Sequence, residues 1–132
     1  MVSQKIELST PQGAMKPIGP YSHIAKVGDF ITISATAGVD PATGALAGPD
    51  MTSQTEQILD AFEVMLKSAG SDLAHIVHIN VFLKDMNDFA EMNIAYAKKL
   101  GDHRPARTAI AVTDLPKPGA LLTMNLTAVT AG

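Results

Sequence analysis

Two spacings of apolar residues divide this chain into strands and helices. In some stretches apolar and small polar residues alternate, as in a β-strand with one buried face, and in others apolar residues recur every three or four positions, as on one side of a helix. The alternating stretches are residues 30–37, 76–84, 107–112 and 120–129, and the helical stretches are residues 58–69 and 89–100. Gly28 and Asp29 predict a hairpin turn between residues 22–27 and 30–37, and residues 3–8 could form a short strand in front.

The first helix has a recognisable beginning and end. Glu56 follows Ser53 by three residues, which is the spacing of a capping box, so we expect Thr52 or Ser53 to cap this helix. Gly70 follows the last apolar residue of the stripe and is expected to stop the helix.

The second helix is expected to begin at Met86 or Asn87 and to be ended by Gly101. The element order is then ββ-α-β-α-ββ, with the short strand in front. A chain of 132 residues with this order is expected to form one α+β domain over residues 1–132, in which the two helices cover one face of the sheet.

Each strand presents an aliphatic face and a second face that is polar but nearly uncharged. The aliphatic face is expected to carry Ile31, Ile33, Ala35 and Ala37 from one strand and Val77, Ile79, Val81 and Leu83 from another. The second face carries Thr32, Ser34, Thr36, His78, Asn80, Thr123, Asn125 and Thr127. Because an exposed sheet face usually carries Lys and Glu, these hydroxyls and amides suggest packing against another copy of the chain. A threonine-rich sheet face open to water is the alternative.

One permanent cation stands at the start of an uncharged strand. Pro105 forces the preceding chain to be extended, and Arg107 then shares one strand face with Ala109 and Ala111. A guanidinium flanked by methyl groups can bind a carboxylate through two parallel hydrogen bonds. We expect Arg107 to share the polar face with Ser34 and so to lie at an interface cleft. The alternative is a surface arginine paired with Asp102 or Asp114.

Composition narrows the function classes. The chain has no cysteine, which excludes disulfides, thiolate nucleophiles and Cys-ligated metal sites. A net charge of -3, few aromatic residues and no tryptophan argue against nucleic-acid binding. No apolar run is long enough to span a membrane and no signal peptide is recognisable, so a soluble, cytoplasmic protein is expected. His75 and His78 lack a third ligand at suitable spacing, so no metal site is expected.

Several short motifs together resemble one family. They are Gly19-Pro20-Tyr21-Ser22, Ile33-Ser34, residues 40–44, residues 81–89, Met92-Asn93 and Pro105-Ala106-Arg107. In this order and spacing they are similar to the Rid (YjgF) family of reactive-intermediate deaminases. The resemblance implies a chorismate-mutase-like fold with a mixed six-stranded sheet, assembled as a homotrimeric barrel with ligand clefts between subunits.

The resemblance also implies an activity and a site. The expected reaction is hydrolysis of enamine or imine intermediates, such as 2-aminoacrylate or 2-iminopropanoate, to 2-keto acids and ammonia without a cofactor. Arg107 would bind the substrate carboxylate, and the main-chain carbonyl of Ala109 would orient the attacking water. The cleft would be shaped by Tyr21, Ser34 and Asn93.

Two positions depart from the family pattern. Thr123 stands where deaminating members carry a glutamate, and a hydroxyl can hold a water but cannot act as a carboxylate base. Ala35 replaces a glycine and adds a methyl group near the cleft. Both departures leave the carboxylate anchor in place. A protein that binds small carboxylates such as keto acids without catalysis is therefore the alternative function, and the ribonuclease activity attached to some relatives is disfavoured by the acidic composition.

Overall fold

The computed structural model describes residues 4–132. In it the chain folds into one sheet with two long helices. The strands are β1 (Glu7–Ser9), β2 (Ile24–Val27), β3 (Phe30–Ala37), β4 (Ile76–Leu83), β5 (Ala106–Ala111) and β6 (Leu122–Val129). The helices are α1 (Met51–Ser68) and α2 (Phe89–Leu100), with short 3-10 turns η1 (Leu73–His75) and η2 (Met86–Asp88). The strand expected over residues 3–8 begins later than predicted, and the part of that prediction on Ser3 lies outside the described residues.

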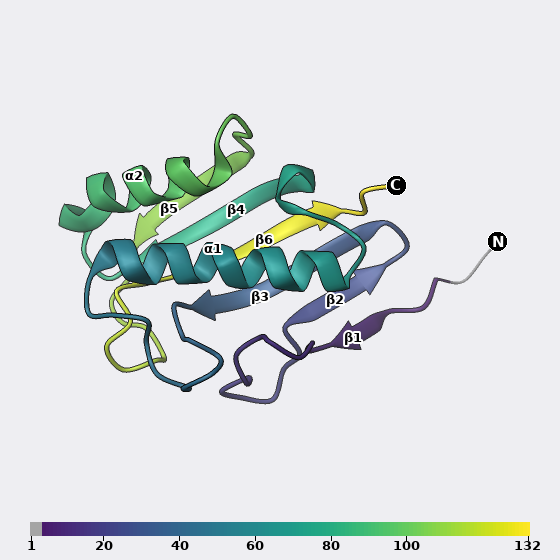
Figure 1. The fold of residues 1–132 in the computed structure, drawn as a ribbon, viewed down its shortest axis with the longest axis horizontal. Coiled ribbons are helices and arrows are strands. Elements are labelled where there is room, and N and C mark those ends of the chain that lie inside the picture. The colour runs from purple at the N-terminus through teal and green to yellow at the C-terminus, as the bar shows by residue number, and fades with distance from the viewer. Residues whose placement is uncertain (1–3) are drawn as a thin grey trace.

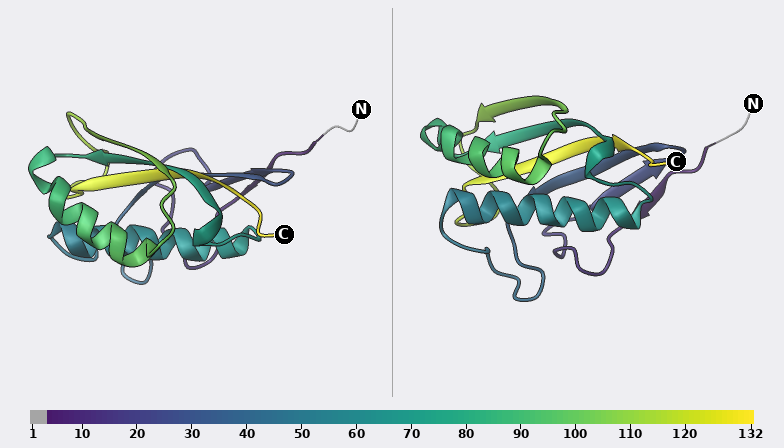
Figure 2. Two further views of the ribbon diagram at one scale, coloured as in Figure 1. Left: turned by 90° about the horizontal axis from the view of Figure 1, so that it is seen from above. Right: turned by 45° about the horizontal axis from the view of Figure 1, so that its top comes forward.

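The sheet has the strand order β1-β2-β3-β6-β4-β5 (Figure 1). Every neighbouring pair is antiparallel except β4 and β5, which are parallel because α2 forms the crossover between them. Both helices lie against the same face of the sheet, and the other face carries no helix (Figure 2). The predicted mixed six-stranded α+β architecture is therefore confirmed.

The core fills the space between the helices and the covered sheet face. On α1, a stripe of apolar residues within the predicted helical stretch 58–69 is fully buried or nearly so, and it packs on the aliphatic residues of β3, β4 and β6. Its members Ile58, Phe62, Met65 and Leu66 have no exposed surface. No helix in residues 4–132 combines the length and the apolar character needed to cross a membrane.

The first helix begins earlier than its sequence motif predicts. Asp50 is the N-cap, and its carboxylate accepts a hydrogen bond from the main-chain N–H of Ser53 at 2.9 Å. The predicted cap at Thr52 or Ser53 is therefore wrong. Asp50 lies ahead of both residues, and its side chain already satisfies a free N–H group in the first turn of the helix. Gly70 follows the helix with a φ of 81°, as expected for its C-terminal stop.

The second helix ends as predicted, but the α-helix begins at Phe89, two to three residues later than the predicted start at Met86 or Asn87. Met86–Asp88 form the 3-10 turn η2, which leads directly into α2. Gly101 ends the helix with a φ of 61°, a backbone conformation that favours glycine.

A β-bulge in β3 changes which side chains face the core. The register with β6 shifts between Ile33 and Thr36. As a result Ala35 is exposed while Thr36 is completely buried, with its hydroxyl bonded to the main-chain oxygen of Ser34 at 2.9 Å. The predicted faces of Ala35 and Thr36 are thus reversed, because the extra residue of a bulge interrupts strict alternation.

A second irregularity affects β4. Its register with β6 shifts between Ile76 and His78, so Ile76 is buried and Val77 is 52% exposed. The expectation that Val77 lies on the aliphatic face is wrong for the same reason as in β3. The remaining predicted core positions of this strand, Ile79, Val81 and Leu83, are fully buried.

Candidate functional site

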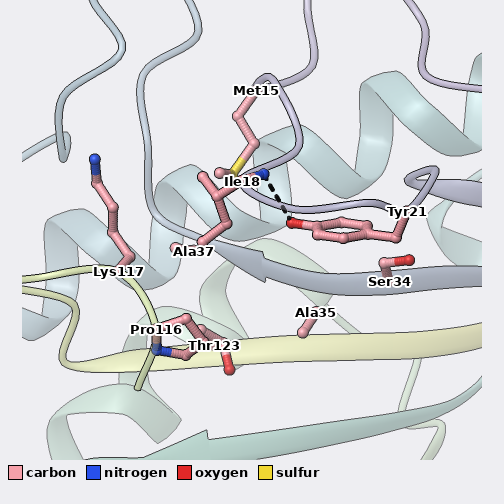
Figure 3. A pocket seen from close by; sticks show the side chains of 9 residues that line it. All are labelled: Met15, Ile18, Tyr21, Ser34, Ala35, Ala37, Pro116, Lys117 and Thr123. Carbon is pink, nitrogen blue, oxygen red and sulfur yellow. Dashed lines mark hydrogen bonds between the residues drawn. The ribbon is translucent and has the colours of Figure 1, made fainter. Parts of the chain in front are cut away.

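A cavity of about 390 Å³ lies beside the bulge of β3, between the N-terminal arm (residues 10–23, between β1 and β2) and the loop that precedes β6. Figure 3 shows the side chains around it. The cavity is lined by Met15, Ile18, Tyr21, Ser34, Ala35, Ala37, Pro116, Lys117 and Thr123. Four of the residues predicted for the site, Tyr21, Ser34, Ala35 and Thr123, are therefore brought together here.

The polar groups of this cavity are held by the main chain. The Ser34 hydroxyl donates a hydrogen bond to the main-chain oxygen of Ser22 at 2.8 Å. The Tyr21 hydroxyl accepts one from the main-chain N–H of Ile18 at 3.4 Å (Figure 3). The first bond ties the arm to β3, and the second fixes the tyrosine hydroxyl within the arm, so the tyrosine ring is placed over the bulge. The bulge in turn exposes Ala35 to the cavity beside Ser34.

Most of the remaining lining is apolar. Met15, Ala37 and the buried Thr123 form part of the wall, and Pro116 and Lys117 come from the loop before β6. A cavity with apolar walls and a few fixed polar groups is the usual form of a small-molecule site. Sequence patterns alone did not identify Met15, Pro116 and Lys117 as wall residues, because these three lie in irregular segments that have no periodicity.

Arg107 lies outside this cavity, beside α2. One of its amino nitrogens donates a hydrogen bond to the side-chain oxygen of Asn93 at 2.8 Å. The guanidinium carbon is 4.9 Å from the ring centre of Tyr96 and 5.5 Å from that of Phe89. The cation is thus held between two aromatic rings and an amide, which fixes the plane of its remaining N–H groups.

Within residues 4–132 the guanidinium of Arg107 pairs with no carboxylate. Asp114, one partner considered from the sequence, is instead 3.9 Å from Lys84. The charge of Arg107 therefore remains available to an anion.

The expectation that Arg107 and Ser34 share one face of the sheet is wrong within a single chain. In the parallel ladder Arg107 stands opposite Ile79, a core residue, so it lies on the face covered by the helices. Ser34 lies in the cavity beside the bulge. The reason is the register between β4 and β5, which alternation within one strand does not determine.

The predicted residues therefore form two separate groups. Asn93 and Arg107 line a second cavity of about 340 Å³, together with Tyr96, Ala97, Arg104 and Pro105. Ala109, the predicted water-orienting residue, follows Arg107 on β5 and stands opposite Val81. Since β5 is the last strand in the sheet order, its outer edge is free of any other described strand.

The histidines do not add a metal centre. The ring of His75 bonds the carboxylate of Asp72 at 2.7 Å, and the ring of His78 bonds the amide of Asn80 at 3.1 Å. Among the described residues no three His, Asp or Glu side chains form a group suited to a metal ion.

His23 differs from the other histidines because it is fully buried. Its ring stands edge-on to that of Tyr21, with 5.6 Å between the centroids. Burial lowers the pKa of His23, and a contact with the main chain of Met15 partly offsets this. His23 therefore packs against Tyr21, which lines the first cavity, as an uncharged ring.

Comparison with known proteins assigns this fold to one family. The family described as Endoribonuclease L-PSP matches residues 11–130. The crystal structure of RidA from the Antarctic bacterium Psychrobacter sp. is 32% identical in sequence and covers 93% of this chain and 98% of its own, with a TM-score of 0.88. The chain belongs to the Rid (YjgF) family.

Two curated relatives show the range of this family. A RutC family protein from Pyrococcus horikoshii is 43% identical to this Rid protein over 111 residues, which is 84% of this chain and 88% of the relative. The 2-iminobutanoate/2-iminopropanoate deaminase of Capra hircus is 39% identical over 102 residues, which is 77% of this chain and 74% of the relative. The family therefore includes an imine deaminase alongside proteins named only by family.

Proposed function

We propose that this Rid protein hydrolyses 2-imino acids to 2-keto acids and ammonia. The observation that carries the proposal is Arg107, a guanidinium held rigidly by Asn93 and two aromatic rings and free of any carboxylate among residues 4–132. Such a group suits the carboxylate that every 2-imino acid carries. The similarity to the goat deaminase supports the same assignment.

The proposed site is completed by a second subunit. Arg107 lies beside α2, whereas Tyr21, Ser34 and Thr123 line the cavity beside β3. Arg107 belongs to β5, whose outer edge is free of any other described strand, so an assembly of three copies that sets this edge against the next subunit would bring the arginine to that subunit's cavity. Apolar side chains on the open sheet face support this assembly, because Val77 is 52% and Ile110 is 46% exposed in the single chain.

The chemistry requires positioning more than strong acid–base groups. Water adds to the imine carbon while the electron pair of the C=N bond moves to nitrogen, which gives a carbinolamine after proton transfer. The carbon–nitrogen bond then breaks, the hydroxyl loses its proton, and one ammonia leaves for each water consumed. Because the imine carbon is already electrophilic, fixing the carboxylate and the water removes most of the orientational cost.

Thr123 and the carbonyl of Ala109 are the proposed contacts for the water. The Thr123 hydroxyl lines the cavity and can both accept and donate a hydrogen bond. It provides no carboxylate base, so proton transfer through solvent or through the leaving nitrogen is expected. We therefore expect slower turnover than a glutamate at this position would support.

The test is a coupled assay in which a pyridoxal-phosphate dehydratase releases 2-aminoacrylate from serine. Wild type should accelerate keto-acid release above the buffer rate, and Arg107→Ala should lower kcat/KM by about 10²-fold or more, since two charge-assisted hydrogen bonds are lost. Lys84→Ala is the matched control, because it removes a cation that pairs with Asp114 and lines neither cavity. Equal rates with wild type and with buffer would end the proposal.

Binding of small carboxylates without turnover is the second candidate function, and Thr123 is the observation that favours it. Thr123→Glu run beside wild type separates the two. If only Thr123→Glu accelerates the reaction, the natural protein keeps the carboxylate site but does not catalyse this hydrolysis.

A further inference from the structure

The cavity beside Arg107 contains a second arginine. Arg104 and Arg107 both line it, on either side of Pro105, and Asn93, Tyr96 and Ala97 of α2 complete the wall. Pro105 keeps the preceding residue extended, so the two cations enter the same space from one short segment. Two guanidiniums in one cavity repel each other unless an anion lies between them.

No protein group neutralises this pair within the described residues. The ion pairs in residues 4–132 use Lys67, His75, Lys84 and Lys99, and none of them includes either arginine. The other residues that line the cavity carry no acidic side chain. The cavity is therefore positive without an internal counter-ion.

Tyr96 lines the cavity together with both arginines. Burial raises the pKa of its hydroxyl, and the positive charges of Arg107 and then Arg104 act in the opposite direction. The residue is only 5% exposed, and its hydroxyl has no hydrogen-bond partner of good geometry among the described residues. A buried donor without a partner, beside two cations, is suited to an anionic ligand.

We propose that this site prefers imino acids with a carboxylate at each end, with Arg107 binding the carboxylate next to the imine carbon and Arg104 binding the distal one. This inference rests on the proposed function and narrows its substrate class. The hydrolysis again consumes one water and releases one ammonia for each imine, and both carboxylates stay intact. The product is a keto acid with two carboxylates.

Two imines that differ in the second carboxylate test the preference. D-aspartate oxidase acting on D-aspartate releases 2-iminosuccinate, and D-amino-acid oxidase acting on D-alanine releases 2-iminopropanoate, with catalase present to remove peroxide. Semicarbazide traps whatever imine the Rid protein leaves unhydrolysed. The measured quantity is the ratio of kcat/KM for the dicarboxylate to that for the monocarboxylate.

Arg104→Gln should lower this ratio by about three- to tenfold, the range expected for one solvent-exposed charge-assisted contact. Arg104→Lys should keep part of the preference, because the charge remains. Lys98→Gln is the matched control, since it removes an equal charge from α2 at a position that does not line this cavity, and it should preserve the ratio. An unchanged ratio in Arg104→Gln would overturn the inference.

A binding experiment keeps the inference testable even if no imine is hydrolysed. Succinate and butanoate have the same number of carbons and differ by one carboxylate, and titration calorimetry gives their affinities directly. Wild type should bind succinate more tightly, and Arg104→Gln should remove the difference. Equal affinities in wild type, or tighter binding of inorganic phosphate than of succinate, would contradict a site built for two carboxylates.

Discussion

At the scale of single residues, the proposed chemistry depends on how Arg107 is held. Its guanidinium lies against the rings of Phe89 and Tyr96, and Asn93 accepts one of its N–H groups. The sequence analysis identified the arginine and the asparagine, but it placed both aromatic residues only among the helically spaced apolar residues of the stretch 89–100. That assignment was incomplete, since Tyr96 is both a core residue and a partner of the cation.

His23 shows how a buried titratable group can link pH to stability. Its pKa is below the ordinary value of 6.5 because burial disfavours the charged ring. As pH falls below about 6.5, the unfolded chain gains a proton at this position that the folded chain does not yet bind. The contribution of neutral His23 to stability is therefore fully present above that pH, and it is lost as the pH is lowered from there.

We expect the free energy of unfolding of wild type to fall as the pH is lowered below about 6.5. His23 should contribute up to about 1.4 kcal/mol per pH unit to this slope. His23→Gln cannot take up this proton, so its slope in the same range should be smaller by that amount. Urea unfolding at several pH values gives both slopes. The slope is compared rather than the absolute stability, so a general loss of packing in the variant does not affect the result. Identical slopes would contradict the burial argument.

At the scale of elements, hydrophobic spacing was sufficient for the order of strands and helices and for most of the core. It failed at the two bulges, where one extra residue reverses the faces of Ala35, Thr36 and Val77. It also failed for the face of Arg107, which the register between β4 and β5 determines. Both features depend on pairing with another strand, and no pattern within a single strand contains that information.

The beginning of α1 is fixed by close contact with the end of β3. A Cβ atom on Gly38 would lie 2.7 Å from both the Cα and the main-chain oxygen of Gln54. The buried Gln54 side chain donates to the main-chain oxygens of Gly48 and Gly119 and accepts from the N–H of Leu121. This contact therefore joins the helix to the loop that carries Pro116 and Lys117 of the first cavity.

Gly38→Ala should destabilise the fold by about 1–3 kcal/mol, because backbone atoms of α1 must move to make room. Gly19→Ala is the control, since its added methyl would meet only the Tyr21 ring, at 3.5 and 3.6 Å, and should change stability by about 0.5 kcal/mol or less. The midpoints of urea unfolding measure both. Equal stability in the two variants would show that α1 is free to shift.

At the scale of the whole molecule, the features of this chain point to a site that one copy does not complete. The open sheet face carries exposed apolar residues, among them Phe30 and Ile110, beside hydrogen-bonded amides such as Asn80 and Asn125. Arg107, the proposed carboxylate anchor, and the cavity beside the bulge belong to different parts of the chain. The proposed reaction therefore requires that the arginine and the cavity of one working site come from different subunits.

The measurement that tests this requirement most directly is complementation between two inactive variants. Arg107→Ala removes the anchor, and Ala35→Phe fills the cavity with an aromatic ring at an exposed position. When the two are co-expressed in equal amounts and mix randomly in the proposed trimer, a site works if its arginine comes from one variant and its cavity from the other. We predict about a quarter of the wild-type activity in the mixed sample, since each condition is met half the time. If the mixed sample is no more active than the two variants assayed separately, the proposal that two subunits share one site is contradicted.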